Sequence, residues 1–222
     1  MLIWSGSAML FSLLPLATVG WLSVAPATAS QGTVAEVADT AAAALAQLAA
    51  DEATVPVRVY DVNHRETRVF RIGRDGSVDE ATRKEIDRMF RCRRTDRQAE
   101  IDQGALAMLA DVSARWPGRT IELVSAFRRV DSRTSRHRQA RAIDFRIQGV
   151  KMTEVRDYVW ATHTELGLGW YPKQNFIHMD HRPGDPDYAW TQIGGKERRG
   201  PSWSKRVRRN ETLRVPGSRV GL

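Results

Sequence analysis

The chain has 222 residues, of which 42% are hydrophobic and 27% charged, and its formal net charge is +8. This composition is sufficient for a hydrophobic core and excludes a wholly disordered chain, while the length suits one main domain with terminal extensions. The single cysteine, Cys92, excludes an internal disulfide and argues against a thiolate metal site. Flanking arginines would favour its thiolate, but no other signal supports a Cys–His nucleophile.

The N-terminal segment, residues 1–29, has the features of a secretory signal. Residues 8–25 are apolar, and an A-x-A pattern precedes Ser30. No Lys or Arg precedes the apolar run, so the segment is predicted to be a cleaved signal peptide or a retained anchor. Both alternatives predict a periplasmic or other extracytoplasmic location, with membrane attachment only if the signal is uncleaved. Export also argues against a nucleic-acid partner. Residues 30–54 are Ala-rich and are predicted to be a helix or a linker.

Residues 55–190 are predicted to form the folded domain. A strand hairpin comes first, and two helices follow, the second of which ends before a Pro-Gly pair. Two strands, a helix and two further strands complete the order. The fold class predicted from this order is α+β, with a small antiparallel sheet and helices packed on one side. The predicted strands are 56–62, 67–73, 120–127, 141–147, 167–172 and 176–181, and the predicted helices are 78–90, 101–116 and 152–166.

The C-terminal segment, residues 191–222, is interpreted as a basic tail. From Gly195 to Leu222 there are nine Lys or Arg and two Glu, so this stretch carries a formal charge of +7 and the rest is close to neutral. A nucleic-acid-binding domain normally places its charge on folded elements, which favours a solvated tail here. The functional alternative is loose attachment to an anionic polymer of the cell envelope.

Three polar residues stand out in and near the predicted strands. Asp144 and His178 each lie between two apolar residues, and His137 lies seven positions before Asp144. Two His and one Asp are a sufficient ligand set for a catalytic zinc ion, provided that the two strands pack side by side. For each residue taken alone, the alternative to metal binding is a structural role in which the side chain is hydrogen-bonded. His64 is predicted to be solvated in the hairpin turn, and His163 to lie near a helix C-terminus.

Four sequence blocks, in this order, resemble the LAS group of zinc peptidases, named after lysostaphin, D-Ala-D-Ala metallopeptidases and sonic hedgehog. They are most similar to the exported branch typified by murein endopeptidase K, whose members read much like S-G-Y-R, S-x-H-x-x-G-x-A-x-D, G-V-G-Y-Y-P and F-V-H-x-D. The corresponding blocks, within a motif core at 90–182, are SAFR (125–128), SRHRQARAID (135–144), GLGWYP (167–172) and FIHMD (176–180).

The resemblance implies a hedgehog/D-Ala-D-Ala-peptidase-like fold and a role for several residues. It implies that Zn²⁺ is bound by His137, Asp144 and His178. It also implies that Arg128 binds the substrate and stabilises the oxyanion, with Ser125 in the same substrate-binding block.

Asp180 matches the acidic residue two positions after the last ligand of the family. On a strand it faces the same side as His178, so it is expected to act in catalysis by orienting the water or taking its proton, or else to brace a ligand. There are two departures from the family. Ala140 stands where the His block has Gly, and Asn175 stands where some relatives of the wider group carry a Glu base.

The function implied by the resemblance is that of an exported zinc metallopeptidase of endopeptidase or carboxypeptidase type. Its expected partner is a peptidoglycan peptide, a stem peptide or a cross-link cleaved during cell-wall remodelling. The alternative is a catalytically weak or inactive LAS-fold module that binds peptidoglycan, which the missing Glu or His base keeps open.

Overall fold

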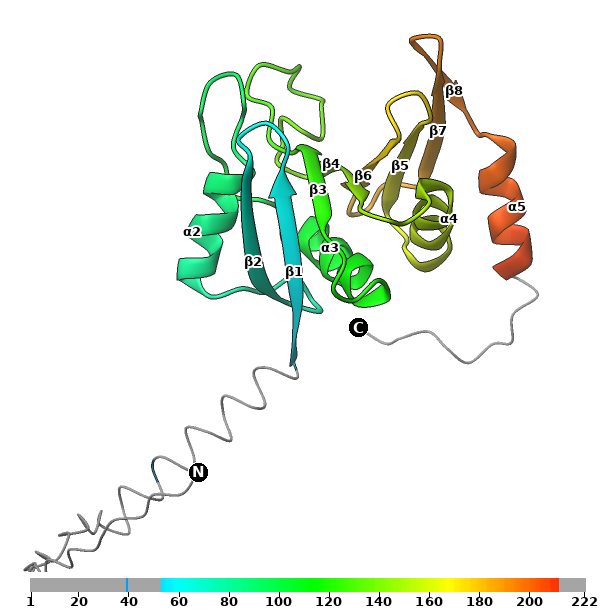
Figure 1. Cartoon of the computed structure of the whole chain (residues 1–222). Helices are drawn as coiled ribbons and strands as arrows, with labels where there is room; N and C mark the ends of the chain where they lie inside the picture. Colours follow the sequence, from blue (N-terminus) through cyan, green and yellow to red (C-terminus); the bar gives the residue numbers. More distant parts are fainter. Residues whose placement is uncertain (1–38, 40–52, 212–222) are drawn as a thin grey trace, which may run out of the picture. The chain divides into compact units, whose positions relative to one another are not determined.

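The computed structural model describes residue 39 and residues 53–211 (Figure 1). The predicted signal at 1–29, nearly all of the Ala-rich stretch, and residues 212–222 lie outside the described residues. Among the helices of the described part, none is long and apolar enough to cross a membrane.

An eight-stranded sheet forms the centre of the domain, in the order β2-β1-β3-β4-β6-β5-β7-β8. The fold is α+β as predicted, but the sheet is larger than expected and is mixed, because β1 pairs with β3, and β5 with β7, in parallel. The strands are β1 (Thr54–Asp61), β2 (Glu66–Gly73), β3 (Ile121–Ser125), β4 (Ala142–Ile147), β5 (Leu166–Tyr171), β6 (Phe176–His181), β7 (Tyr188–Ile193) and β8 (Lys196–Arg199).

Four helices are described with the sheet: α2 (Glu80–Met89), α3 (Gln103–Arg115), α4 (Met152–Thr162) and α5 (Ser202–Glu211). Aspartate side chains fix the starts of the first two, because Asp79 and Asp102 each accept a hydrogen bond from a backbone N–H of the first helical turn. The β1–β2 hairpin, α2, α3 and α4 confirm the predicted elements, with ends that differ by a few residues.

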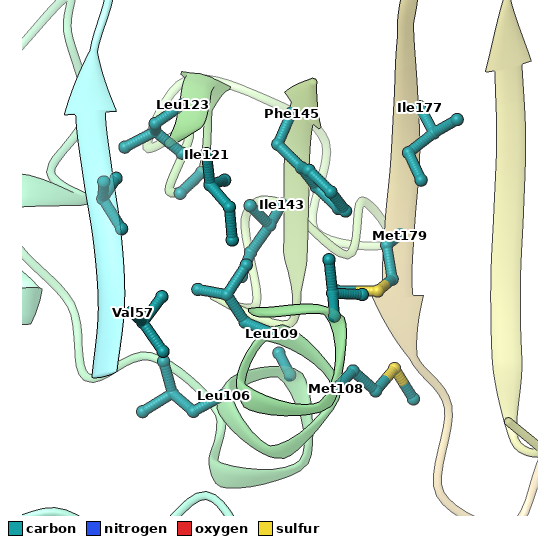
Figure 2. Packing of buried hydrophobic residues seen from close by; sticks show 14 of the residues in the cluster. Val57, Leu106, Met108, Leu109, Ile121, Leu123, Ile143, Phe145, Ile177 and Met179 are labelled. Atoms are coloured by element: carbon teal, nitrogen blue, oxygen red, sulfur yellow. The ribbon is translucent and has the colours of Figure 1, made fainter. Parts of the chain in front are cut away.

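The hydrophobic core lies between α3 and one face of the sheet (Figure 2). Leu109 of α3 projects towards Ile143 of β4 and Leu106 lies near Val57 of β1, and the same sheet face carries Phe145 and Met179. Successive residues of a strand point to opposite faces. The intervening residues, Asp144 on β4 and His178 and Asp180 on β6, therefore share the other face.

The chain beyond residue 190 continues into ordered elements, where the sequence indicated a solvated tail. The Trp203 side chain of α5 is buried, and its indole N–H donates to Thr191 Oγ1 at 2.9 Å. The indole N–H of Trp160 in α4 donates to the carbonyl of Ser204 at 2.9 Å. Arg208 lies 3.9 Å from the centre of the Trp160 ring. Part of the positive charge of this segment is thus carried on β8 and on a helix that packs against α4.

Candidate metal centre

The register of the sheet places five residues of the candidate site in one row. Each residue is the pairing partner of the next, across β3, β4, β6, β5 and β7 in turn. The row runs Ser125, Asp144, His178, Gly169 and Trp190. All four sequence blocks therefore meet at the same level of the sheet, although they are far apart in the chain.

His137, Asp144 and His178 converge as the sequence predicted. The loop between β3 and β4 carries His137 over the two strands. Its Nε2 lies 3.0 Å from His178 Nδ1 and 3.2 Å from Asp144 Oδ1, and His178 Nδ1 lies 2.8 Å from the same carboxylate oxygen. Each of the three residues is at most 7% exposed. This buried triangle of one oxygen and two nitrogen atoms is a candidate metal site.

The outer ring nitrogens determine which inner atoms carry a lone pair. His137 Nδ1 lies 2.6 Å from the carbonyl oxygen of Ala126, and His178 Nε2 lies 2.9 Å from Asp180 Oδ2. Both partners are acceptors, so in the neutral imidazoles these outer nitrogens carry the protons. The inner nitrogens, His137 Nε2 and His178 Nδ1, are then unprotonated. Their lone pairs point towards each other and towards the Asp144 carboxylate. Such an arrangement is repulsive unless a cation lies among the three atoms, so the donor set fits a metal ion such as zinc.

Arg128 contacts the Asp144 carboxylate. Its Nη2 donates to Asp144 Oδ2, the oxygen that does not face the two imidazoles, and its Nε donates to Ser125 Oγ at 2.8 Å. Its Nη1 lies 3.9 Å from Asp131 Oδ2. With 37% of its side chain exposed, the guanidinium is both fixed in position and accessible to a ligand.

Asp180 lies behind His178 rather than beside the converging atoms. It is fully buried, and its two oxygens accept three hydrogen bonds, from His178 Nε2 and from Nε and Nη2 of Arg182. Burial alone would raise the pKa of Asp180, but these partners outweigh it and lower the pKa to about 2. The carboxylate is therefore ionised and already engaged. The sequence reading overlooked Arg182, although it lies two positions after Asp180 and so on the same side of the chain.

The two glycines of the GLGWYP block make room for the site. A Cβ on Gly167 would lie 2.1 Å from Asp180 Oδ2, and a Cβ on Gly169 would lie 2.4 Å from the Trp190 indole. That indole packs against His178, with the ring centres 5.0 Å apart. Side chains at either glycine would displace a group that holds the His178 ring. The sequence reading did not include Trp190, because it lies outside the four blocks.

The departures from the family pattern are local. Ala140 has a φ of 57°, in the left-handed region that glycine adopts most readily. The alanine therefore keeps the backbone conformation that suits the glycine of the family pattern. Asn175 has a φ of 54° and lies exposed after the tight turn between β5 and β6. Asparagine tolerates this conformation better than most residues, which gives Asn175 a structural role in the turn.

The remaining candidate residues are held in other contacts. His64 Nδ1 lies 2.6 Å from Asp61 Oδ2. Together with Glu66, these two residues form a second group whose nitrogen and oxygen atoms are close enough to hold a metal ion. Glu66, however, is paired with arginines of α2 and of the segment that follows it, which compete with a metal ion. His163 Nε2 lies 3.1 Å from Asp111 Oδ2, between α3 and α4. None of these contacts reaches the site on β4 and β6.

The metal-free protein is expected to lose stability as the pH rises from about 6.5 to about 9. Burial alone would lower the pKa of His178, but Asp144 and Asp180 outweigh it and raise the pKa from 6.5 to about 9. The charged ring therefore stabilises the fold fully below pH 6.5, and this contribution is lost as the pH rises through the folded-state pKa. Urea unfolding of chelator-treated protein should show a loss on the order of a few kcal/mol. A flat profile over this range would contradict the assignment, and His64→Ala should keep the slope.

Comparisons with known proteins agree with the resemblance found in the sequence. The model of a peptidase family described as peptidoglycan L,D-endopeptidase MepK matches residues 49–185, more than half of the chain. The peptidoglycan L,D-endopeptidase MepK of Escherichia coli strain K12 is 26% identical over 121 residues, covering 49% of this chain and 65% of that protein. The probable peptidoglycan L,D-endopeptidase MepK of Haemophilus influenzae is 29% identical over 114 residues, covering 45% of this chain and 61% of that protein.

The chain thus spans somewhat less than two thirds of the length of these two relatives. No solved structure matches it significantly. The family match includes all four sequence blocks and the three converging residues of the site. The predicted likeness to the murein endopeptidase K branch is confirmed, and the chain belongs to the family described as peptidoglycan L,D-endopeptidase MepK.

Proposed function

We propose that this chain is an exported zinc peptidase that hydrolyses peptide bonds in peptidoglycan stem peptides or cross-links. The observation that carries this proposal is the close approach of His137 Nε2, His178 Nδ1 and Asp144 Oδ1, in a chain that belongs to this family. Zinc held by these three residues would supply Lewis acidity, which would polarise a carbonyl group and lower the pKa of bound water towards roughly 7.

The residues around the metal ligands have separate tasks in this proposal. Arg128 binds a carbonyl or carboxylate of the substrate and stabilises negative charge that develops on the carbonyl oxygen, because its guanidinium is exposed and held by Ser125. Asp180 and Arg182 fix the orientation and the tautomer of His178. Because both Asp180 oxygens are already engaged, we assign this carboxylate to bracing the ligand rather than to carrying protons.

The direct test is digestion of purified peptidoglycan by the zinc-loaded chain without its first 29 residues. Mass spectrometry of the soluble products should show newly released stem-peptide fragments, and a chelator should abolish their release. The same products identify the bond that is cut. Binding to peptidoglycan without any released fragment would contradict the proposal and would favour the alternative of an inactive binding module.

The thiol of Cys92 should be dispensable for this reaction. Cys92→Ser is expected to keep metal content and turnover close to those of the original protein, because zinc-assisted hydrolysis needs no protein nucleophile. Metal analysis and an assay on peptidoglycan fragments provide the check. Loss of turnover in a variant with normal metal content and a normal circular dichroism spectrum would overturn the zinc mechanism.

A further inference from the structure

A pocket of about 260 Å³ has Arg128 in its lining. It is formed between the segment that follows α2 and the segment that follows β3. A backbone hydrogen bond from Phe127 N–H to the carbonyl of Phe90, 3.1 Å long, joins the two segments. The pocket is lined by Arg93, Arg94, Arg128, Cys92, Phe127, Val130 and Asp131.

The lining of this pocket carries an excess of positive charge. Three of the residues that line it are arginines, and Asp131 is its one acidic residue. Asp131 lies 3.9 Å from Arg128, which partly offsets both charges. Within residues 53–211, neither Arg93 nor Arg94 forms an ion pair, and Arg93 Nη1 donates to the neutral side chain of Asn63 at 3.1 Å. Guanidinium groups without a carboxylate partner are suited to bind an anion.

The buried thiol of Cys92, which also lines the pocket, indicates a similar preference for negative charge. Burial alone would raise the pKa of this thiol, but hydrogen bonds from Thr95 and from the backbone N–H groups of Arg94 and Arg129 outweigh it and lower the pKa. These contacts also connect the segment of Arg94 to that of Arg129. The two arginines that follow Cys92 are therefore held close to Arg128.

We propose that this pocket binds a carboxylate on the substrate residue next to the cleaved bond, with Arg93 and Arg94 determining specificity. The inference rests on the function proposed above and adds the residues that recognise an acidic group at that position of the stem peptide. Arg128 connects the two sites, because its Nη2 donates to Asp144 Oδ2 and the same residue lines the pocket. The apolar side chains of Phe127 and Val130 suit the aliphatic part of such a residue.

The test compares two soluble stem-peptide analogues, one with free carboxylates and one with carboxamides in their place. Their peptide bonds are N-methylated so that the metal-loaded protein does not consume them, and binding is measured by isothermal titration calorimetry. The original protein should prefer the carboxylate form. The double variant Arg93→Gln, Arg94→Gln should bind the carboxylate form at least about tenfold more weakly, since a hydrogen bond to a charged group contributes about 1.5–3 kcal/mol. Its binding of the carboxamide form should change little.

A charge-matched control separates local recognition from general attraction between the basic protein and an acidic peptide. Arg133→Gln with Arg198→Gln removes the same charge from two exposed residues outside the pocket. An equal loss of affinity in both double variants, or no preference for the carboxylate form in the original protein, would overturn the inference.

The two proposals fail in different ways. If cleavable stem peptides are hydrolysed while carboxylate selectivity is absent, the pocket assignment is wrong and the enzymatic function stands. If the pocket selects carboxylates while no stem peptide is hydrolysed, the function is wrong and the recognition site stands.

Discussion

Replacing His178 by alanine is expected to abolish both metal retention and hydrolysis. His178 Nδ1 lies 2.8 Å from Asp144 Oδ1 and 3.0 Å from His137 Nε2, and without it only two ligands remain. A two-ligand site holds zinc poorly, because catalytic zinc sites in proteins use three protein ligands. The zinc-to-protein ratio after gel filtration should fall from about one to near zero, and turnover should fall to background.

Matched controls distinguish the ligand from the other histidines of the domain. His64→Ala and His163→Ala change residues that contact Asp61 and Asp111 and should retain one zinc ion per chain. Because the alanine variant leaves a cavity, His178→Gln serves as a second variant that keeps more of the volume, and circular dichroism monitors its fold. Full zinc occupancy in either folded His178 variant would rule out the assignment.

Replacing Asp180 by asparagine is expected to weaken zinc binding by about 10 to 100-fold, the usual effect of removing a group that orients a metal ligand. The amide keeps the size of the carboxylate but removes the charge that attracts the His178 N–H and the Arg182 guanidinium. At saturating zinc, turnover should largely recover. Zinc affinity from competition with a chelating dye and turnover as a function of zinc concentration are measured on the same variant.

A loss of turnover without a loss of zinc affinity would support a role of Asp180 in proton transfer, which the family resemblance also allows. Normal zinc affinity together with a loss of turnover of roughly 100 to 10,000-fold would identify Asp180 as the general acid or base. Asp185→Asn is a suitable control. This exposed carboxylate pairs with Arg136, which also approaches Asp180 Oδ1 at 3.9 Å. Unchanged affinity and turnover in Asp180→Asn would exclude both roles.

The sequence alone was sufficient to predict which residues converge at the candidate metal site and most of the elements. Asp144 and His178 were identifiable because each interrupts an apolar strand, where a polar side chain requires a partner. Local patterns also predicted the first hairpin and three helices, because capping residues and hydrophobic periodicity depend on near neighbours in the chain. The resemblance, based on four ordered blocks, extended this to the family and is confirmed by the family match.

Tertiary structure decided the features that depend on residues far apart in the chain. Strand pairing placed Ser125, Asp144, His178, Gly169 and Trp190 in one row, and no local pattern specifies that register. It also brought β7, β8 and α5 onto the domain, where charge composition had indicated a solvated tail.

The difference between bracing a ligand and transferring a proton was likewise beyond the sequence. The alternation of a strand placed Asp180 on the face of His178, but both roles require that face. Which role the carboxylate can fill depends on where its oxygens point and on which groups already occupy them. In the structure these oxygens accept from His178 and Arg182, and Gly167, which lacks a side chain, leaves the space that the Asp180 carboxylate fills. Hydrogen bonds and close packing are fixed only when the strands assemble, so the sequence indicated which residues belong to the candidate site and the fold determined what each one contacts.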